Sequence, residues 1–419
     1  MTERRGAGFF SRHRDELVVA VLALSASLAG LSNDFVYDDL PLIRDNARVH
    51  GLSHWRDLFT QPYWPPPFVE QLYRPVTLLM AAFEWSIGGG APMTYRLVSY
   101  ALYAAGAVLV YRLASRLLAR PVALAVAVLF AVHPVHVEAV ALGVNQGELL
   151  LGMLAALCVA HYIDRRRGDG LRALDWAMLA AACAVAALTK ENGFALAGLL
   201  LAAEVLPLDA RSARERTRAL WPGFLGLVAV GACVLALRNY LLPHDAITVV
   251  TAPALEGHGP FGRMYAMLQV VPMWLRLFAW PARLQVDFAP GEIPYPTRFG
   301  LWEFAGLALL AAAAVAVLRT WRRRPVFAFG VLWCAAALLP VSNIIPTGIM
   351  LAERTLYVPS IGFVMAVGAA AEWTLERWPA RRVRNGLVAL GLTLAVLGIV
   401  RSGGRQSVWN SAHIVVSPR

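Results

Sequence analysis

The stretch YRLVSYALYAAGAVLVYRLASRLL, residues 95–118, is followed almost at once by PVALAVAVLFAVHPVHVEA, residues 121–139. Each run is mainly apolar over about 20 residues, the length that an α-helix needs to cross roughly 30 Å of hydrocarbon. Similar runs recur along most of the chain, separated by short loops rich in arginine. This pattern predicts an all-α protein that crosses a membrane many times.

The composition of the 419 residues supports the same class. The chain is 58% hydrophobic and 16% charged, and its mean hydropathy of +0.56 lies above the range of soluble globular domains. A net charge of +11 would suggest nucleic acid in a soluble protein. Here the arginines lie between apolar runs, where they orient the chain and contact lipid headgroups. We therefore expect membrane lipids as partners and no nucleic acid.

We predict about eleven spans, with a further apolar segment at 262–281. Pro272, Arg263 and Arg276 within that segment favour an interfacial helix over a crossing one. If it does not cross, every arginine-rich loop falls on the cytoplasmic side together with the N-terminus, and the C-terminus lies outside. The predicted spans are 16–31, 95–118, 121–139, 146–163, 172–189, 191–207, 220–240, 300–319, 325–342, 355–372 and 384–401.

This topology predicts one catalytic membrane domain, residues 1–403, and an outer tail, residues 404–419. Two long outer loops belong to the domain, residues 32–94 and 241–299, the second with the interfacial helix. Acids, histidines and aromatic residues collect on the outer face, which favours chemistry on that side. We find no inverted repeat, and its absence weakens a transporter interpretation.

The sequence FVYDD, residues 35–39, places two acids just after the first apolar run. Asp38 and Asp39 could form a hydrated turn or a helix cap. They could instead supply a general base for a hydroxyl nucleophile, with the second acid raising the pKa of the first, binding a metal or holding the acceptor. The length and aromatic content of loop 32–94 favour a binding or catalytic role.

The sequence HPVHVEAV, residues 133–140, carries His133, His136 and Glu138 at an outer helix end. These side chains could decorate the membrane interface, grip a phosphate or hold a metal. As a metal signal the pattern is weak, and we consider Mg²⁺ or Mn²⁺ at Asp39, His136 and Glu138 only as an option. Glu148 starts the following helix, where a carboxylate also complements the helix dipole.

In TKEN, residues 189–192, Lys190 and Glu191 separate two apolar runs with almost no loop. An ionisable pair at that depth is a functional hypothesis by default, against the alternative of a snorkelling lysine paired with its neighbour. Lys190 is the only lysine of the chain, which suggests that a compact point charge was needed, for example on a phosphate.

In AERTLYVPS, residues 352–360, Arg354 suits bidentate phosphate recognition and Tyr357 suits a hydrogen bond to phosphate or sugar. An interfacial anchor belt is the alternative. Glu353 lies in the same motif.

These motifs resemble, in type and in order, those of the TMTC proteins, the transmembrane and tetratricopeptide-repeat O-mannosyltransferases of the GT-C superfamily. The resemblance covers about residues 30–410. It implies an inverting GT-C fold, a polyprenyl-phosphate-linked sugar donor (dolichyl phosphate mannose in that family) and a hydroxyl acceptor on a protein, lipid or glycan. The motifs are FVYDD, YRPVT, HPVHVEAVA with GELL, TKENG, WLRLFAWPARLQVDF and AERTLYVPSIGF.

The resemblance also implies roles for single residues. Asp38 and Asp39 match the acidic pair that contains the base, and Arg74 matches the arginine of YRP. His136, Glu138 and Glu148 match the polar turn of the family. Lys190 and Glu191 match its lysine–acid pair. The late motif, which would grip the donor phosphate, is matched by Glu353, Arg354 and Tyr357.

The chain departs from the family pattern at two places. GVNQGE, residues 143–148, lacks an expected arginine, and SVWNSAHIVVSPR, residues 407–419, resembles the segment that precedes the repeats, although no repeats follow. Arginine and alanine richness resembles a GC-rich bacterium. We therefore expect an inner-membrane enzyme with a periplasmic site and an undecaprenyl-type donor. A lipid-linked sugar flippase or an inactive scaffold with this fold are the alternatives.

Overall fold

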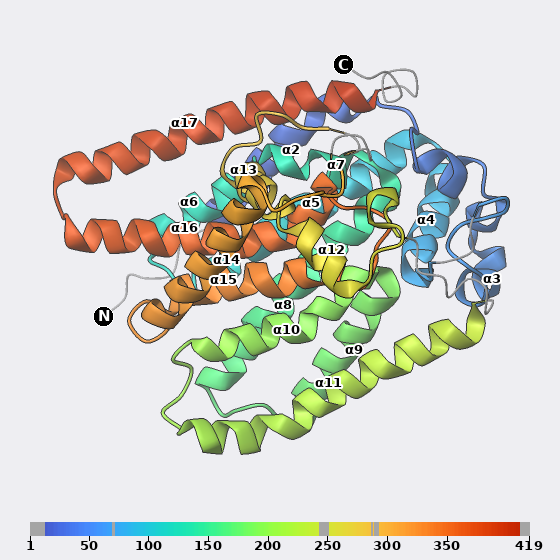
Figure 1. Cartoon of the computed structure of the whole chain (residues 1–419). Helices are drawn as coiled ribbons and strands as arrows, with labels where there is room; N and C mark the ends of the chain where they lie inside the picture. The colour runs from blue at the N-terminus through green and yellow to red at the C-terminus, as the bar shows by residue number, and fades with distance from the viewer. Residues whose placement is uncertain (1–12, 69–71, 243–250, 286–287, 289–292, 411–419) are drawn as a thin grey trace, which may run out of the picture.

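The computed structural model describes residues 13–68, 72–242, 251–285, 288 and 293–410, and every regular element within these ranges is helical (Figure 1). The chain therefore has the all-α architecture that its apolar runs predict. The helices are α2 (Arg14–Ser27), α3 (Trp55–Thr60), α4 (Pro75–Gly88), α5 (Pro92–Ala114), α6 (Arg120–Ala131), α7 (Val137–Ala141), α8 (Gln146–Arg167), α9 (Ala173–Thr189), α10 (Ala195–Ala202), α11 (Ala213–Leu241), α12 (Pro260–Met267), α13 (Val270–Ala279), α14 (Leu301–Thr320), α15 (Pro325–Leu338), α16 (Tyr357–Arg377) and α17 (Arg381–Gln406).

Six helical segments among the described residues are long and apolar enough to cross a membrane, and a bent pair of α6 with residues 134–141 could add a seventh. The predicted number of eleven spans is therefore not confirmed. Each predicted span does contain a helix, but α2, α9, α10 and α15 are shorter than a full crossing. The six segments are Pro92–Ala114, Gly143–Arg167, Ala213–Leu241, Leu301–Thr320, Glu353–Arg377 and Arg381–Trp409.

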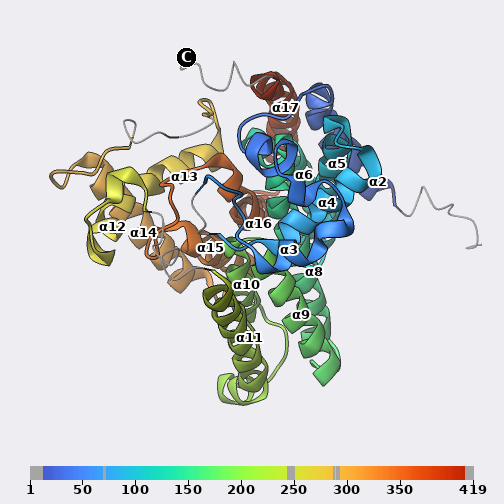
Figure 2. The same ribbon diagram turned by 90° about the vertical axis from the view of Figure 1, so that its right-hand side faces the viewer.

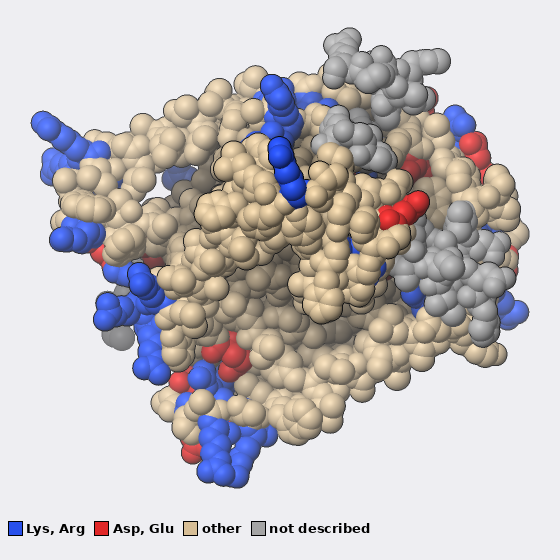
Figure 3. Space-filling model, viewed as in Figure 1, with Lys and Arg blue, Asp and Glu red and all other residues tan. Residues whose placement is uncertain are grey.

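The segment predicted to lie along the membrane surface, 262–281, is not one continuous helix. It divides into α12, of 8 residues, and α13, of 10 residues. The arginine-rich turns that join α14 to α15 and α16 to α17 lie at the same end of the molecule, opposite α3 and α4 (Figure 1). Figure 3 shows Lys and Arg side chains gathered along that end. This placement agrees with the prediction that both turns face the same side of the membrane.

The centre of the fold is a bundle in which α5, α8, α15 and α16 lie side by side, while α9 and α11 extend away from it (Figure 2). Small residues allow α15 and α16 to touch backbone to backbone, as is common between membrane helices. A Cβ atom on Gly330 would lie only 2.5 Å from the carbonyl oxygen of Gly362. This close contact fixes the start of α16, where the 3₁₀ turn Glu353–Leu356 presents its polar side chains.

The predicted boundary between domain and tail, at residue 403, falls inside α17. This helix continues to Gln406, and a 3₁₀ turn, Ser407–Trp409, follows it. Trp409 is fully buried against the loop that carries FVYDD, in contact with apolar residues such as Phe35 and Val36. The membrane domain thus extends at least to Trp409, and residues 411–419 lie outside the described ranges.

Candidate functional site

The two acids of FVYDD have different surroundings. Asp39 is fully buried, and its carboxylate accepts hydrogen bonds of 3.0 Å from the backbone N–H groups of Gly143 and Val144. Arg96 lies 3.5 Å from the same carboxylate. Burial raises the pKa of the Asp39 carboxyl, while the charge of Arg96 and the two amides oppose that rise. The Asp39 carboxylate is therefore occupied by these contacts and has a structural role.

Asp38 is only partly buried, and its carboxylate forms no hydrogen bond or ion pair with the residues that the structure describes. Burial raises the pKa of Asp38 above its ordinary range, and the negative charges of Asp39 and Glu138 raise it further. The positive charges of Arg354 and Arg74 lower it. Asp38 is thus an available carboxylate with raised basicity, facing two arginines.

Arg354 is held in this position by Glu138. The Glu138 carboxylate accepts a hydrogen bond of 2.7 Å from the backbone N–H of Arg354 and forms a close ion pair with its guanidinium group. Glu138 is fully buried, whereas the Arg354 side chain keeps 15% of its surface exposed. Because α7 carries Glu138 and the turn before α16 carries Arg354, this pair joins two distant segments beside Asp38.

Lys190 and Glu148 form a second ion pair at the site. The Nζ atom of Lys190 lies 2.7 Å from Glu148 Oε1, and the same oxygen accepts a hydrogen bond of 3.2 Å from Asn192. The other oxygen of Glu148 is buried and has no hydrogen-bond partner among the described residues. Burial lowers the pKa of Lys190, while Glu148 opposes this and the nearby charges of Arg74 and Arg354 add to it.

Arg74 completes the cationic side of the site. Its guanidinium group forms a two-pronged contact with Glu191, with distances of 2.6 and 3.0 Å to Oε2, and lies 4.9 Å from the centre of the Tyr63 ring. Lys190 and Glu191 do not pair with each other, which was the alternative to a functional role, because each binds a different residue. The backbone conformation explains why the two do not pair: Lys190 has an extended conformation at the end of α9, so its side chain and that of Glu191 diverge.

The structure thus brings Asp38, Arg74, Glu138, Lys190 and Arg354 together, with Glu148 and Glu191 as partners of the cations. Arg354 and Arg74 act electrostatically on Asp38, and both act on Lys190. In this arrangement a carboxylate with no partner among the described residues faces two arginines, and Lys190 lies near the same arginines. The carboxylate can accept a proton while the cations stabilise an anion next to it.

Four of the residues predicted at the site lie elsewhere. His136 contacts Tyr103 at 3.0 Å and Ser360 at 2.9 Å, and His133 contacts the carbonyl oxygen of Phe278 at 3.0 Å. These contacts connect helices around the site. Both histidines therefore connect parts of the helical bundle, a role that differs from the interface decoration considered from the sequence.

Tyr357 and Glu353 are also engaged by other parts of the bundle. Tyr357 is fully buried between α5 and α8, and a Cβ atom on Gly106 would lie 2.7 Å from its hydroxyl oxygen. Glu353 is fully buried, accepts a hydrogen bond from the backbone N–H of Gln285 and lies 3.6 Å from Arg405. Neither side chain is among the groups that chiefly shift the pKa of Asp38.

The metal site considered at Asp39, His136 and Glu138 is not formed. Each of the three side chains is committed to other partners, and the described residues contain no group of three or more His, Cys, Asp or Glu side chains that could hold a metal ion. These three residues therefore do not fit a metal, and we assign no step to one.

Sequence reasoning missed a buried polar set beneath the site, formed by Arg96, Glu84 and Gln146. Gln146, the first residue of α8, donates a hydrogen bond of 3.1 Å to Glu84 and another of 3.2 Å to Ser99. Burial raises the pKa of Glu84 to about 8. The available signal was a charged residue within an apolar run, which is rare without a function.

Comparisons with known proteins show which proteins this chain is similar to. Residues 70–236 match the family described as dolichyl-phosphate-mannose-protein mannosyltransferase. Protein O-mannosyl-transferase TMTC3 of Mus musculus is 28% identical over 384 residues, which are 84% of this chain and 41% of that protein. Protein O-mannosyl-transferase TMTC4 of Homo sapiens is 26% identical over 449 residues, 94% of this chain and 60% of that protein.

A solved structure shows a similar fold. It is that of the archaeal oligosaccharyltransferase AglB from Archaeoglobus fulgidus, in complex with an inhibitory peptide and a dolichol-phosphate. It superposes with a TM-score of 0.51 at 14% identity and covers 96% of this chain and 56% of that chain. The chain is similar to the TMTC proteins and has a GT-C fold. It spans less than two thirds of the length of the curated relatives that it matches.

Proposed function

We propose that the chain is an inverting glycosyltransferase that moves a mannose-like sugar from a polyprenyl-phosphate donor to an acceptor hydroxyl on the outer face of a membrane. The observation that carries this proposal is the difference between the two acids: Asp39 is fully engaged, and Asp38 is unpaired and faces Arg354. A catalytic base must be free to accept a proton, so Asp38 is the base and Asp39 its support.

In the reaction, the acceptor oxygen attacks the anomeric carbon from the face opposite the phosphate. The bond between that carbon and the phosphate oxygen breaks, the acceptor proton passes to the Asp38 carboxylate, and polyprenyl phosphate leaves with the bonding electron pair. Negative charge grows on the leaving phosphate, where preorganised cations stabilise the transition state most. Arg354 and Lys190 are placed to do this, with Arg74 beside them.

The acidic partners of these cations serve the same chemistry. Glu138, Glu148 and Glu191 hold the three cations in fixed positions before the donor arrives. The cost of reorganising the site during the reaction is thereby reduced. Two features support an outer-face site. The arginine-rich turns lie at the opposite end of the molecule from α3 and α4, and α4 begins directly after Arg74. The proposal also includes a bacterial inner membrane and an undecaprenyl-type donor, which the arginine and alanine richness of the sequence suggests.

The test is to incubate the purified protein in lipid nanodiscs with a panel of polyprenyl-phosphate sugars and membrane extract, and to identify glycosylated products by mass spectrometry. Wild type should transfer one sugar, and Asp38→Asn should lower the turnover about 10²- to 10⁴-fold, the usual contribution of a general base. Asp34→Asn is the matched control in the same loop, because the Asp34 side chain is exposed and, among the described residues, accepts a hydrogen bond only from the neighbouring N–H of Phe35.

Normal turnover by Asp38→Asn would overturn the assignment of the base. Movement of the labelled lipid across the bilayer without a new glycosidic bond would favour a flippase instead. Binding of donor without either outcome would favour an inactive scaffold.

A further inference from the structure

Arg96, near the start of α5, is the least expected charge in the molecule. Its side chain is fully buried, although it belongs to a helix that is otherwise apolar enough to cross a membrane. One terminal nitrogen donates a hydrogen bond of 2.7 Å to the carbonyl oxygen of Asp34. The other donates to the carbonyl oxygen of Ala141 and lies 3.5 Å from the Asp39 carboxylate.

These contacts join the two segments that define the catalytic geometry. Asp34 and Asp39 flank Asp38 in the same loop, while Ala141 ends α7, the helix that carries Glu138. Glu138 in turn holds Arg354. A single guanidinium group therefore links the loop of the base to the helix that positions the cation opposite it.

Asp39 extends this link to a third segment. It binds Arg96 on one side and the N–H groups of Gly143 and Val144 on the other. That turn leads directly into α8, which carries Glu148, the partner of Lys190. The position of Gly143 is tight, because a Cβ atom there would lie 2.9 Å from Ile43 and 3.1 Å from Tyr95.

These contacts require the two terminal nitrogens of an arginine guanidinium group. Guanidinium presents several N–H donors in a fixed plane, so that one side chain can serve two carbonyl oxygens and a carboxylate at once. A lysine has the same charge on a single nitrogen and could serve Asp39 only by releasing one of the carbonyl oxygens. The contacts therefore select for shape as well as for charge.

We propose that Arg96 is a positioning residue for the transfer reaction, setting the distance and orientation of Asp38 relative to Arg354. It does not touch the substrates and acts through the loop and α7. The proposal rests on the function proposed above. It predicts that loosening this link slows the chemical step while donor binding, which depends on Arg354 and Lys190 themselves, is retained.

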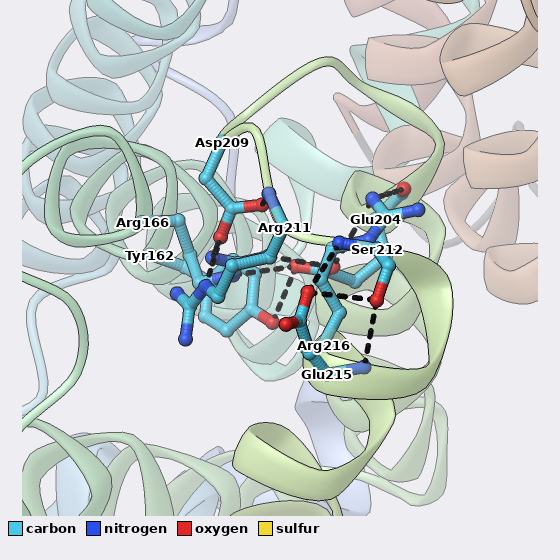
Figure 4. A network of polar contacts seen from close by, with 8 residues as sticks. All are labelled: Tyr162, Arg166, Glu204, Asp209, Arg211, Ser212, Glu215 and Arg216. Atoms are coloured by element: carbon cyan, nitrogen blue, oxygen red, sulfur yellow. Dashed lines mark hydrogen bonds and ion pairs between the residues drawn. The ribbon is translucent and has the colours of Figure 1, made fainter.

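The chain offers a matched control at the C-terminal end of α8, whereas Arg96 lies in the polar set that includes Gln146 at the start of that helix. Arg166 is also fully buried, and its guanidinium group binds Glu204 at 2.8 and 2.9 Å and pairs with Asp209 (Figure 4). Replacing either arginine by lysine removes the same fork from a buried site. Only Arg96 is connected to the segments around Asp38.

The experiment compares Arg96→Lys, Arg166→Lys and wild type, as full chains in nanodiscs, with undecaprenyl phosphate mannose as the probe. Three quantities are measured: release of undecaprenyl phosphate per folded molecule, affinity for undecaprenyl phosphate alone, and the thermal unfolding midpoint. Because a misplacement of about 1 Å can cost roughly 10²-fold in rate, Arg96→Lys should lower kcat about 10- to 100-fold. Affinity for undecaprenyl phosphate should stay within about threefold of wild type.

Arg166→Lys should lower the unfolding midpoint and leave kcat per folded molecule within about twofold of wild type. If Arg96→Lys loses activity only in proportion to its folded fraction, as Arg166→Lys would, the role of Arg96 is merely structural. Unchanged kcat in a fully folded Arg96→Lys protein would also overturn the proposal.

A second measurement separates this inference from the proposed function. If Arg96 acts through Asp38, adding Arg96→Lys to Asp38→Asn should change the residual rate by less than twofold, because residues that act as a unit are not additive. Multiplying losses would show that Arg96 acts elsewhere, although Asp38 would still be the base. Normal turnover of Asp38→Asn alone would instead refute the proposed function, whatever Arg96 does.

Discussion

The two ends of α8 carry two clusters of buried charge that differ in how completely they are paired. At the end near Arg167, Arg166 binds Glu204 and Asp209, and Tyr162 donates a hydrogen bond of 2.8 Å to Glu204 (Figure 4). The other end lies about 30 Å away by helix length. There Asp38 has no partner among the described residues, and Glu84 is buried near the negative charge of Asp39.

This difference distinguishes a structural network from a reactive one. Taking charges out of water is costly, and a closed network offsets that cost with its own ion pairs. An unpaired acid beside a second acid lowers stability, so stability alone does not account for it. The cluster around Arg166 fixes the ends of α8 and α11, whereas the cluster around Asp38 retains a group that can react.

The largest effect, on stability, should follow from removing the cation of the fully paired cluster around Arg166. Arg166→Met leaves Glu204 and Asp209 without their main cation, so the protein should lose about 3–5 kcal/mol of stability. Activity per folded molecule should not change. Thermal unfolding in nanodiscs, combined with a turnover assay normalised to the folded fraction, checks both expectations. A specific loss of turnover would break the comparison, because it would give the Arg166 cluster a part in catalysis.

Removing the cation opposite the base should affect rate and pH dependence together. Arg354→Gln should lower kcat/KM about 10²- to 10³-fold, the usual cost of losing one preorganised transition-state contact. Because Arg354 lowers the pKa of Asp38, its removal should raise that pKa further. Only ionised Asp38 accepts a proton, so the acidic limb of the kcat/KM profile should move to higher pH than in wild type. A limb that stays in place would mean that Asp38 is not the titrating base.

A somewhat smaller effect is expected at Lys190. A hydrogen bond to a charged group contributes about 1.5–3 kcal/mol, so Lys190→Met should lose roughly 10- to 150-fold in kcat/KM. The double variant Lys190→Met with Glu148→Gln removes both charges of the pair. It should recover the stability lost by the single variant but not its activity. Recovered activity would show that Lys190 serves only to neutralise Glu148.

The smallest effect concerns the stability that the protein loses when the buried Glu84 carboxyl near Asp39 ionises. Burial raises the pKa of Glu84 to about 8, whereas an unfolded Glu titrates near 4.3. Stability from neutral Glu84 is therefore fully present below about pH 4.3 and is lost as the pH rises towards about 8. Glu84→Gln avoids this loss, so its unfolding midpoint should exceed that of wild type by about 2–4 °C at pH 8 and by much less at pH 5. An equal difference at both pH values would contradict the raised pKa.

The sequence predicted the helical class and the position of each apolar segment, because runs of about 20 apolar residues leave few alternatives. It did not predict their lengths. Polar motifs such as TKEN and HPVH end helices early, so that α9 stops at Thr189 and α6 at Ala131. Whether such a break interrupts a span depends on tertiary packing, which periodicity does not report.

The site was predictable where charge alone decides and unpredictable where geometry decides. Lys190 was singled out because it is the only lysine of the chain and separates two apolar runs, and Arg354 because its motif suits phosphate recognition. Arg74 was named through the resemblance to the family motif YRP. The ion-pair partners were not predicted: a Lys190–Glu191 pair was the alternative to a functional role, and the structure pairs Glu191 with Arg74 and Lys190 with Glu148. Arg96 was overlooked because one arginine within a long apolar run resembles an interfacial anchor until its three contacts are known.

The single lysine has a practical consequence for labelling chemistry. Lys190 provides the only side-chain amine in the chain and keeps just 9% of its surface exposed, and burial lowers its pKa towards the reactive, uncharged form. An amine-selective acylating reagent therefore has one side-chain target, which lies near Arg74 and Arg354. A mass increase on the peptide that contains Lys190, and its suppression by a bound phosphate, would report occupancy of the site in the unmodified protein, without any mutation.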